Sequence, residues 1–152
     1  MITCKGGDQL KNMPAKTPIS PHFSEDFSFK YKVTYGPEQH EYHTHKQFDI
    51  IFMLSPNSVC HVSEKNWKVP KNSIILFNNM DLHKITLNTH ERFERYTLSF
   101  KPEYIESLSS KETDLLECFF LRPFSNPYIL PLTIPQAEEC LTQLKRLITC
   151  ND

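Results

Sequence analysis

The stretch His43-Thr44-His45-Lys46-Gln47-Phe48-Asp49-Ile50-Ile51-Phe52-Met53-Leu54 joins a polar segment containing two histidines to a run of apolar residues. Side chains alternate between the two faces of a strand, so His43 and His45 are expected to point the same way from an extended segment. Asp49 has the same parity if the strand continues without a bulge. Because the apolar run follows directly, this polar face is expected to point into a buried space.

Short segments with strand-like sequences lie on both sides of this stretch. Residues 27–35 have an apolar or aromatic side chain at every odd position, which is typical of a half-buried strand. The further expected strands cover residues 41–45, 48–54, 58–63, 66–69, 73–77, 83–88 and 92–100. Many short strands separated by proline and asparagine turns predict an antiparallel sandwich or barrel rather than βαβ units.

Helical patterns replace strand patterns after Pro102. Short helices are expected at 104–108 and 111–120, and the apolar segment 124–132 is expected to lie along the barrel. The segment 135–150 places apolar residues at i, i+3, i+4 and i+7, which predicts an amphipathic helix. Such a helix can pack one stripe on the barrel and present a neighbouring stripe to a twofold mate.

These patterns divide the 152 residues into three parts. Residues 1–22 are polar and punctuated by prolines, so they are expected to form a leader or arm. Residues 23–100 form the expected barrel, and residues 101–152 form the expected helical segment. The amphipathic helix runs to the end of the sequence, and we expect the natural protein to continue beyond it.

The composition fits a globular domain of ordinary size, with 39% hydrophobic and 23% charged residues. A net charge of −1 gives the chain no overall field that would attract nucleic acid. The five cysteines lack C-x-x-C spacing and are expected to be reduced thiols, as in cytosolic proteins. No signal peptide is visible, and no apolar run approaches the roughly 20 residues that span a membrane. A cytoplasmic protein without a membrane partner is therefore expected.

Four polar side chains are candidates for one shared site: His43, His45, Asp49 and His83. Zinc, iron, nickel and manganese accept imidazole nitrogen and carboxylate oxygen, so these four residues could hold a divalent metal. The same groups could instead hydrogen-bond one another, water or an organic ligand. The sequence leaves both a metal site and a polar ligand pocket open.

Strand parity places further side chains on the same inner face. These inward-facing candidates are Met53, Ile85, Arg95 and Thr97. Arg95 could hold a carboxylate or hydroxyls of a ligand, or it could pair with Asp49 or Glu94 as part of the fold. The histidines expected at turns or exposed strand positions, in contact with solvent, are His40, His61 and His90.

Two stretches resemble the two cupin motifs: residues 43–54, quoted above, and Val69-Pro70-Lys71-Asn72-Ser73-Ile74-Ile75-Leu76-Phe77-Asn78-Asn79-Met80-Asp81-Leu82-His83. A third stretch, Phe93-Glu94-Arg95-Tyr96-Thr97-Leu98-Ser99-Phe100-Lys101-Pro102-Glu103-Tyr104-Ile105, is more particular. It resembles the N-terminal sensor domain of AraC-family transcription regulators, in which an Arg-containing strand leads through a Pro into short helices. The resemblance covers about residues 27–150.

The resemblance implies a mainly β fold, the double-stranded β-helix of the cupins (a jelly-roll-like barrel), followed by C-terminal α-helices that mediate homodimerisation. It also implies a small-molecule effector inside the barrel. DNA would be bound only by a C-terminal pair of helix-turn-helix units, which these 152 residues do not contain. Asp49 stands where metal-binding cupins usually have Glu, which is one methylene longer.

We therefore expect a ligand-sensing and dimerisation domain of an AraC-type regulator without catalytic residues. Its effector would contact His43, His45, Asp49, Met53, His83, Ile85, Arg95 and Thr97. The alternative is a small metal-dependent cupin enzyme, a dioxygenase or isomerase, that uses the two motif histidines, Asp49 and His83 as metal ligands. A third alternative is a dimerisation module whose barrel is filled by its own side chains.

Overall fold

Strands form where the sequence alternates or runs continuously apolar, and turn residues separate them. This computed structural model describes residues 26–87, 90–123 and 128–149. The strands are β1 (Phe27–Tyr35), β2 (Glu38–Gln39), β3 (Phe48–Met53), β4 (Ser58–Val62), β5 (Lys65–Val69), β6 (Ser73–Phe77), β7 (His83–Leu87), β8 (Arg92–Phe100) and β9 (Ile129–Pro131). The helices are α1 (Pro102–Glu106), α2 (Glu117–Phe120) and α3 (Ile134–Thr149).

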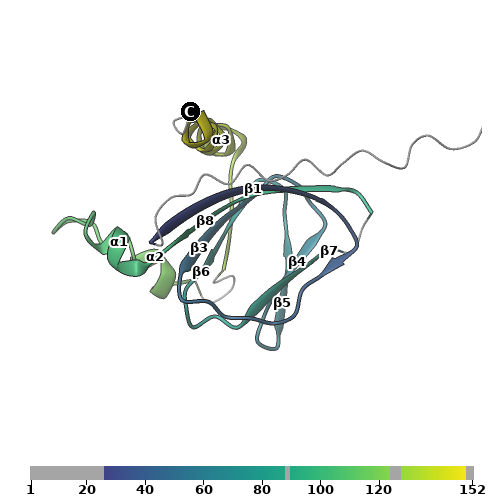
Figure 1. The fold of residues 1–152 in the computed structure, drawn as a ribbon, viewed down its shortest axis with the longest axis horizontal. Coiled ribbons are helices and arrows are strands. Elements are labelled where there is room, and N and C mark those ends of the chain that lie inside the picture. Colours follow the sequence, from purple (N-terminus) through teal and green to yellow (C-terminus); the bar gives the residue numbers. More distant parts are fainter. Residues whose placement is uncertain (1–25, 88–89, 124–127, 150–152) are drawn as a thin grey trace, which may run out of the picture.

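Two antiparallel sheets face each other and enclose the interior, with the helices outside them (Figure 1). The first sheet has the strand order β1-β8-β3-β6-β9, and the second has the order β2-β7-β4-β5. Every strand pairing is antiparallel, as in jelly-roll barrels. The expected mainly β barrel followed by a C-terminal helix is confirmed.

The predicted strand at residues 41–45 is wrong. Within this segment only His43 pairs, in an isolated antiparallel bridge with His83. The backbone N–H of each residue donates to the carbonyl of the other at 3.0 Å. The reason lies in the path of the chain, because it leaves β2 in one sheet for β3 in the other and meets β7 only at His43.

The predicted helix at residues 111–120 is mostly absent, since α2 covers only Glu117–Phe120. The hydroxyl of Ser110 accepts hydrogen bonds from the backbone N–H groups of Glu112 and Thr113, at 3.2 and 3.1 Å. The carboxylate of Asp114 accepts from the N–H of Leu116 at 2.9 Å. Short polar side chains thus capture the N–H groups that a helix would need, and they hold this segment in turns.

β3 is covered on both faces, which explains its nearly continuous apolar sequence. Ile51 and Met53 point inward and belong to the core between the two sheets. Phe52 points outward and packs beneath α3 with Phe29 and Tyr96. Asp49 lies on the same inward face of β3 as Ile51 and Met53, because every second side chain points to the same side. It therefore faces the cavity described below.

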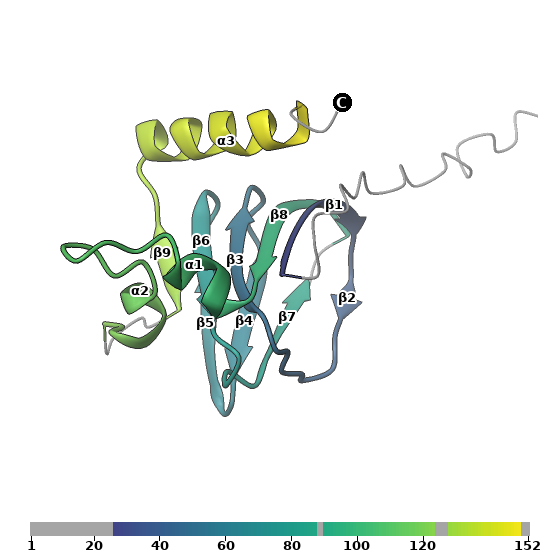
Figure 2. The same ribbon diagram turned by 60° about the vertical axis from the view of Figure 1, so that its left-hand side comes forward.

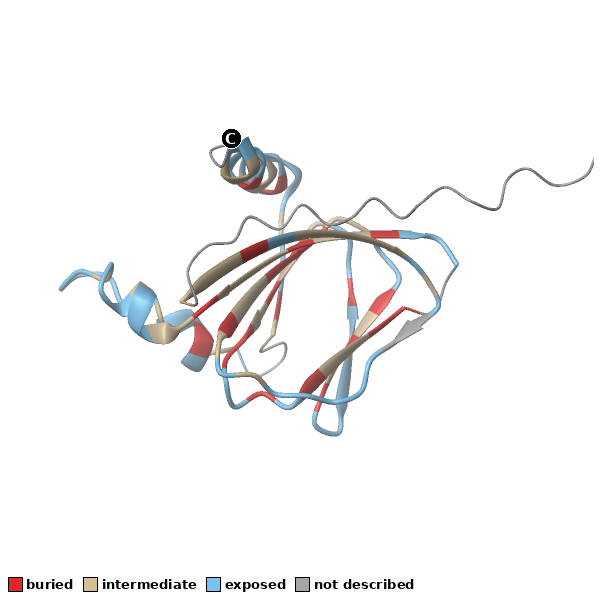
Figure 3. Ribbon diagram, in the orientation of Figure 1, coloured by how far each residue is buried: buried red, intermediate tan, exposed pale blue. Residues whose placement is uncertain are grey.

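α3 lies across the outer face of the first sheet (Figure 2). Its buried residues are Ala137 and Leu144, which pack with Phe29 of the sheet. The buried part of the helix is on the side toward the strands (Figure 3). The predicted apolar stripe is confirmed, and its further members are Cys140, Leu141, Leu147 and Ile148. At the start of the helix, the side-chain oxygen of Gln136 accepts from the backbone N–H of Thr133 at 2.9 Å, which is one half of a capping box, and from its hydroxyl at 2.8 Å.

β9 adds a strand to the barrel from the segment that was expected to lie along it. Ile129 pairs with Ile75, and Leu130 pairs with Ile74 at the edge of the first sheet. The chain passes from β9 to α3 within two residues, so the edge strand and the outer helix are directly connected. Among the described helices, none combines the length and the apolar character that crossing a membrane requires.

Candidate functional site

A cavity of about 240 Å³ lies between the two sheets. Its wall consists of His40, His43, Asp49, Ile51, His83, Ile85, Leu87, Phe93, Arg95 and Thr97. Inward-facing positions of β3, β7 and β8 supply most of this wall, because alternate residues of each strand point to the same side. The wall combines imidazole, carboxylate and guanidinium groups with aliphatic and aromatic surface.

The structure brings most of the predicted site residues to this cavity. His43, Asp49, His83, Ile85, Arg95 and Thr97 line it. Met53 is fully buried in the inner core, and it is the partner of Arg95 in the β3–β8 register. His45 lies beside the cavity, where its ring is half-buried against the other two histidines.

Four residues of the wall were missed by sequence reasoning. Ile51, Leu87 and Phe93 share strand parity with Asp49, His83 and Arg95, so the same alternation could have identified them. His40 is exposed, as expected of a solvated residue, yet its side chain also lines the cavity. Its position follows from the pairing of β2 with β7, which no local pattern predicts.

Two other histidines were also expected to be solvated. His90 is exposed, which agrees with the expectation. For His61 the expectation is wrong: its ring is half-buried, and its Nδ1 and Nε2 lie 2.6 and 2.8 Å from the side-chain oxygens of Asn66 and Thr86. Asn66 and Thr86 lie on the two strands that flank β4, so sheet pairing holds this ring in place.

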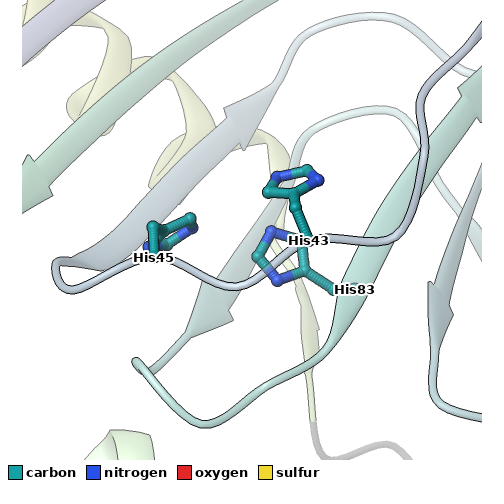
Figure 4. A group of neighbouring side chains, drawn as sticks. All are labelled: His43, His45 and His83. Atoms are coloured by element: carbon teal, nitrogen blue, oxygen red, sulfur yellow. The ribbon is translucent and has the colours of Figure 1, made fainter.

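The imidazoles of His43, His45 and His83 form a cluster between the segment before β3 and the start of β7 (Figure 4). The ring centroids of His43 and His83 are 4.6 Å apart, and those of His45 and His83 are 5.1 Å apart. One ring nitrogen from each residue lies within 4.8 Å of the other two. The backbone bridge between His43 and His83 sets two of these rings side by side.

A shared hydrogen-bond pattern fixes the tautomer of all three rings. The Nδ1 atoms of His43, His45 and His83 lie 3.0, 2.6 and 2.8 Å from the carbonyl oxygens of Glu41, Gln47 and Asp81. A carbonyl only accepts, so each Nδ1 must carry the proton that it donates. The Nε2 atoms are therefore the ones left to bind a ligand, and backbone contacts of this kind orient metal-binding histidines in proteins.

The electrostatic surroundings of the rings differ. Nε2 of His45 is buried and lies 3.1 Å from a carboxylate oxygen of Asp49. This contact with the Asp49 carboxylate raises the pKa of His45, and partial burial opposes that shift. Burial lowers the pKa of His83. The surroundings thus shift the pKa values of His45 and His83 in opposite directions.

The residue types of the histidine cluster suit a divalent metal. The distances between their nitrogens would suit it after small side-chain movements. Three imidazoles and one carboxylate suit zinc, iron, nickel or manganese. Nitrogens bound to one tetrahedral zinc are about 3.3 Å apart, as follows from a Zn–N distance of about 2.0 Å. The imidazoles, whose nitrogens are separated by up to 4.8 Å, would have to converge, and His43 is exposed enough to rotate.

Arg95 supplies a different chemistry farther along the cavity. Its Nη1 lies 3.5 Å from the hydroxyl of Thr34, and its guanidinium lies over the ring of Phe93 at 5.0 Å. Its neighbour Glu94 points to the outer face, where Tyr31 and Arg92 bind its carboxylate. The guanidinium therefore adds a planar, permanently charged donor to the cavity wall.

A buried ion pair lies next to the histidine cluster, and sequence reasoning missed it. The guanidinium of Arg122 binds the carboxylate of Asp81 through two contacts of 3.1 and 2.9 Å. Both side chains are only 10% exposed. The two residues are 41 positions apart, and nothing in either local sequence predicts that they meet.

Comparison with known proteins identifies the type of domain. Residues 31–151 match the family model described as the AraC-like ligand binding domain. No curated protein matched the sequence of the chain.

Solved structures share the fold at low sequence identity. One is the cupin domain of Cnp3 from Schizosaccharomyces pombe, with 11% identity, 73% of this chain and 79% of that chain covered, and a TM-score of 0.53. A Cupin 2 conserved barrel domain protein from Salinispora arenicola has 11% identity, coverage of 69% and 96%, and a TM-score of 0.50. The plu4264 protein from Photorhabdus luminescens has 14% identity, coverage of 70% and 98%, and a TM-score of 0.50. These likenesses establish the cupin barrel.

Proposed function

Because this chain belongs to the family of AraC-like ligand binding domains, we propose that it is the ligand-sensing and dimerisation domain of a transcription regulator, and not an enzyme. The observation that carries the proposal is the cavity of about 240 Å³ between the sheets, whose wall mixes charged, polar and apolar side chains. A pocket of this kind can orient one small molecule by a few polar contacts and bury the rest of its surface. A barrel filled by its own side chains would have no such cavity.

The effector that fits this cavity is small and polar, such as a sugar or a small organic acid. Ligand pockets commonly measure about 300–1,000 Å³, so the volume here favours a compact molecule. Asp49 pairs with Ser99 in the β3–β8 register, and Arg95 lies four residues farther along β8, which separates these two positions by about 13 Å along the strands. The histidine cluster and the guanidinium thus mark opposite polar ends, with Ile51 and Thr97 between them.

A panel of sugars and small carboxylic acids tests this proposal by thermal shift and calorimetry. We expect at least one compound to raise the melting temperature of the wild-type protein and to bind Arg95→Gln much more weakly. Arg92→Gln is a matched control, because Arg92 lies on the same strand and its side chain is 53% exposed on the other face. Equal loss of binding in both variants would count against a site inside the barrel.

Dimerisation is proposed to use α3. This helix buries one stripe on the sheet, and Glu138, Glu139, Lys145 and Arg146 remain exposed on its other sides. A helix of this kind can meet its twofold mate along an exposed side without leaving the barrel. Sedimentation equilibrium of the wild-type chain and of Glu139→Arg/Arg146→Glu would show whether reversing charges on α3 changes the mass of the particle.

The regulator would bind DNA through a helix-turn-helix region that is separate from the residues described above, and it would act in the cytoplasm. In this scheme the effector changes how α3 and the barrel hold the DNA-binding part. The scheme requires a difference in effector affinity between two arrangements of the regulator.

One observation favours a second candidate, a metal-dependent cupin enzyme. All three clustered histidines direct Nδ1 to a backbone carbonyl, which leaves three Nε2 atoms for a metal. A bound metal would supply Lewis-acid or redox chemistry, and the residues of this chain would orient it and limit the access of water. Metal analysis of the purified protein tests this candidate, since stoichiometric metal that is lost in His43→Ala/His45→Ala would support it.

A further inference from the structure

The turn between β6 and β7 contacts the cavity on one side and the helical segment on the other. The backbone carbonyl of Asp81 accepts from Nδ1–H of His83 at 2.8 Å. The carboxylate of the same residue binds both terminal nitrogens of Arg122, which lies two residues after the end of α2. One residue therefore connects a histidine of the cavity to the end of a helix outside the barrel.

Asn78 strengthens this connection from within the same turn. Its backbone N–H donates to the carboxylate of Asp81 at 2.7 Å, and its side-chain amide donates to the carbonyl of Phe119 in α2 at 3.2 Å. The side chain of Asn78 is buried, so these bonds are shielded from water. The turn is consequently attached to α2 at Phe119 and to the segment just after α2 at Arg122.

Aromatic contacts form a second route between the same places. The ring of His83 stacks on Phe77, and the ring of Tyr128 lies 6.1 Å from that of Phe77. The guanidinium of Arg122 lies 4.7 Å from the centre of the Tyr128 ring. The contacts therefore form a closed ring, called the circuit below. It runs from His83 through Asp81 to Arg122, and from there through Tyr128 and Phe77 back to His83. Tyr128 directly precedes β9, which leads to α3.

We propose that Asp81 and Arg122 are positioning residues that hold the imidazole of His83 at the cavity and transmit its position to α2, β9 and α3. The two parallel hydrogen bonds of the pair fix its geometry, and burial makes separation of the charges unfavourable. A ligand that moves His83 must therefore move the turn with it or break the bond to the Asp81 carbonyl. The regulatory use of this link rests on the proposed sensing function.

Coupling of this kind acts in both directions, so the link can be tested without knowing the effector. At the cavity end, His83→Gln removes the imidazole. At the helical end, Arg122→Lys keeps the charge and loses the planar fork, whereas Asp81→Asn/Arg122→Gln removes both charges and keeps similar shapes. Lys101→Gln is the control, because it removes an exposed ion pair with Asp26 that lies outside the circuit.

Two measurements on the 152-residue protein report on the two ends. Hydrogen exchange followed by mass spectrometry measures the protection of β9 and the first turns of α3. Long-range proton–nitrogen NMR correlations identify which ring nitrogen of His83 carries the proton. The thermal transition of each variant establishes that it is folded, and Arg122→Lys carries the test if the double variant does not fold.

The proposal predicts that His83→Gln speeds exchange in β9 and early α3 about fivefold or more, in line with ordinary coupling between sites. When His83→Gln is introduced into Asp81→Asn/Arg122→Gln or into Arg122→Lys, it should change the exchange rate in β9 and early α3 much less. Both helical-end variants should also convert His83 from one tautomer to a mixture, and Lys101→Gln should not. An unchanged exchange pattern in His83→Gln, or an equal change in every background, would overturn the proposal.

The test separates this inference from the sensing function. Binding of cobalt(II) and of the effector panel is measured by calorimetry on the same variants. Exchange coupling without any ligand binding would remove the sensing function and leave the positioning roles of Asp81 and Arg122 intact. Ligand binding without exchange coupling would refute the positioning roles and leave the sensing function intact.

Discussion

The imidazole of His83 lies flat on the ring of Phe77, with centroids 3.7 Å apart and planes inclined by 12°. The carbonyl of Asp81 accepts a hydrogen bond from Nδ1 of the same imidazole at 2.8 Å. Stacking and hydrogen bonding together leave little rotational freedom, so Nε2 is presented to the cavity before any ligand arrives. This preorganisation leads to a first prediction about Phe77.

Phe77→Leu should weaken cobalt(II) or effector binding, because it removes the flat surface that supports His83. We expect a loss of stability of about 1–2 kcal/mol, because the smaller leucine fills the space of the aromatic ring incompletely, measured by urea denaturation. Phe100→Leu is the matched control, since Phe100 is equally buried but packs with Phe48 and Phe119 in another cluster. If Phe100→Leu loses as much stability as Phe77→Leu but binds normally, the binding defect of Phe77→Leu arises from the lost support of His83.

Arg95→Gln should weaken binding of an acidic effector by roughly 10- to 100-fold, the amount expected when a hydrogen bond to a charged group is lost. The reason is that the guanidinium is the charged donor at one end of the cavity. Calorimetry at constant ionic strength measures the affinity, and Arg92→Gln should bind normally. An unchanged affinity in Arg95→Gln would mean that the effector does not reach this end of the barrel.

The stability of the ligand-free protein should depend on pH in opposite senses through two histidines. Asp49 raises the pKa of His45, so the stabilisation it provides is present below the unfolded pKa, near 6.5, and is lost as pH rises through the folded value. Burial lowers the pKa of His83, so its stabilising contribution is present above about pH 6.5 and is lost as pH falls.

Thermal denaturation of two variants at pH 5.5 and 8.5 checks this prediction. His45→Gln should destabilise the protein more at pH 5.5 than at pH 8.5. His83→Gln should show the opposite trend, which makes each variant the control for the other. The same trend in both variants would contradict the opposite pKa shifts of His45 and His83.

Leu144→Ala should reduce the free energy of unfolding by about 2–4 kcal/mol, because it opens a cavity between α3 and the sheet. Leu144 is 8% exposed and packs in the cluster that contains Phe29 and Phe52. Gln143→Ala, at an exposed neighbouring position, should change stability by less than about 0.5 kcal/mol. Urea denaturation measures both values, and equal stability of the two variants would show that α3 does not depend on this stripe.

The features of the fold that the sequence determined by itself depend on residues that are close together in the chain. The alternation at 27–35 and the apolar stripe of α3 depend only on the period of a strand or a helix, so they were predictable. The same parity rule placed Asp49 and Arg95 at the cavity. In these cases the local period decides which side chains share a face, and the packed neighbours decide how deeply that face is buried.

Tertiary structure alone decided the features that depend on distant residues. His43 bridges to His83 across 40 positions instead of extending a strand, because the chain crosses between sheets there. The pairing of Asp81 with Arg122 likewise arises where α2 packs beside the β6–β7 turn. Sequence period fixes the direction of a side chain relative to its own strand or helix. Only the packed sheets determine which distant side chain it meets, and hence what the cavity can bind.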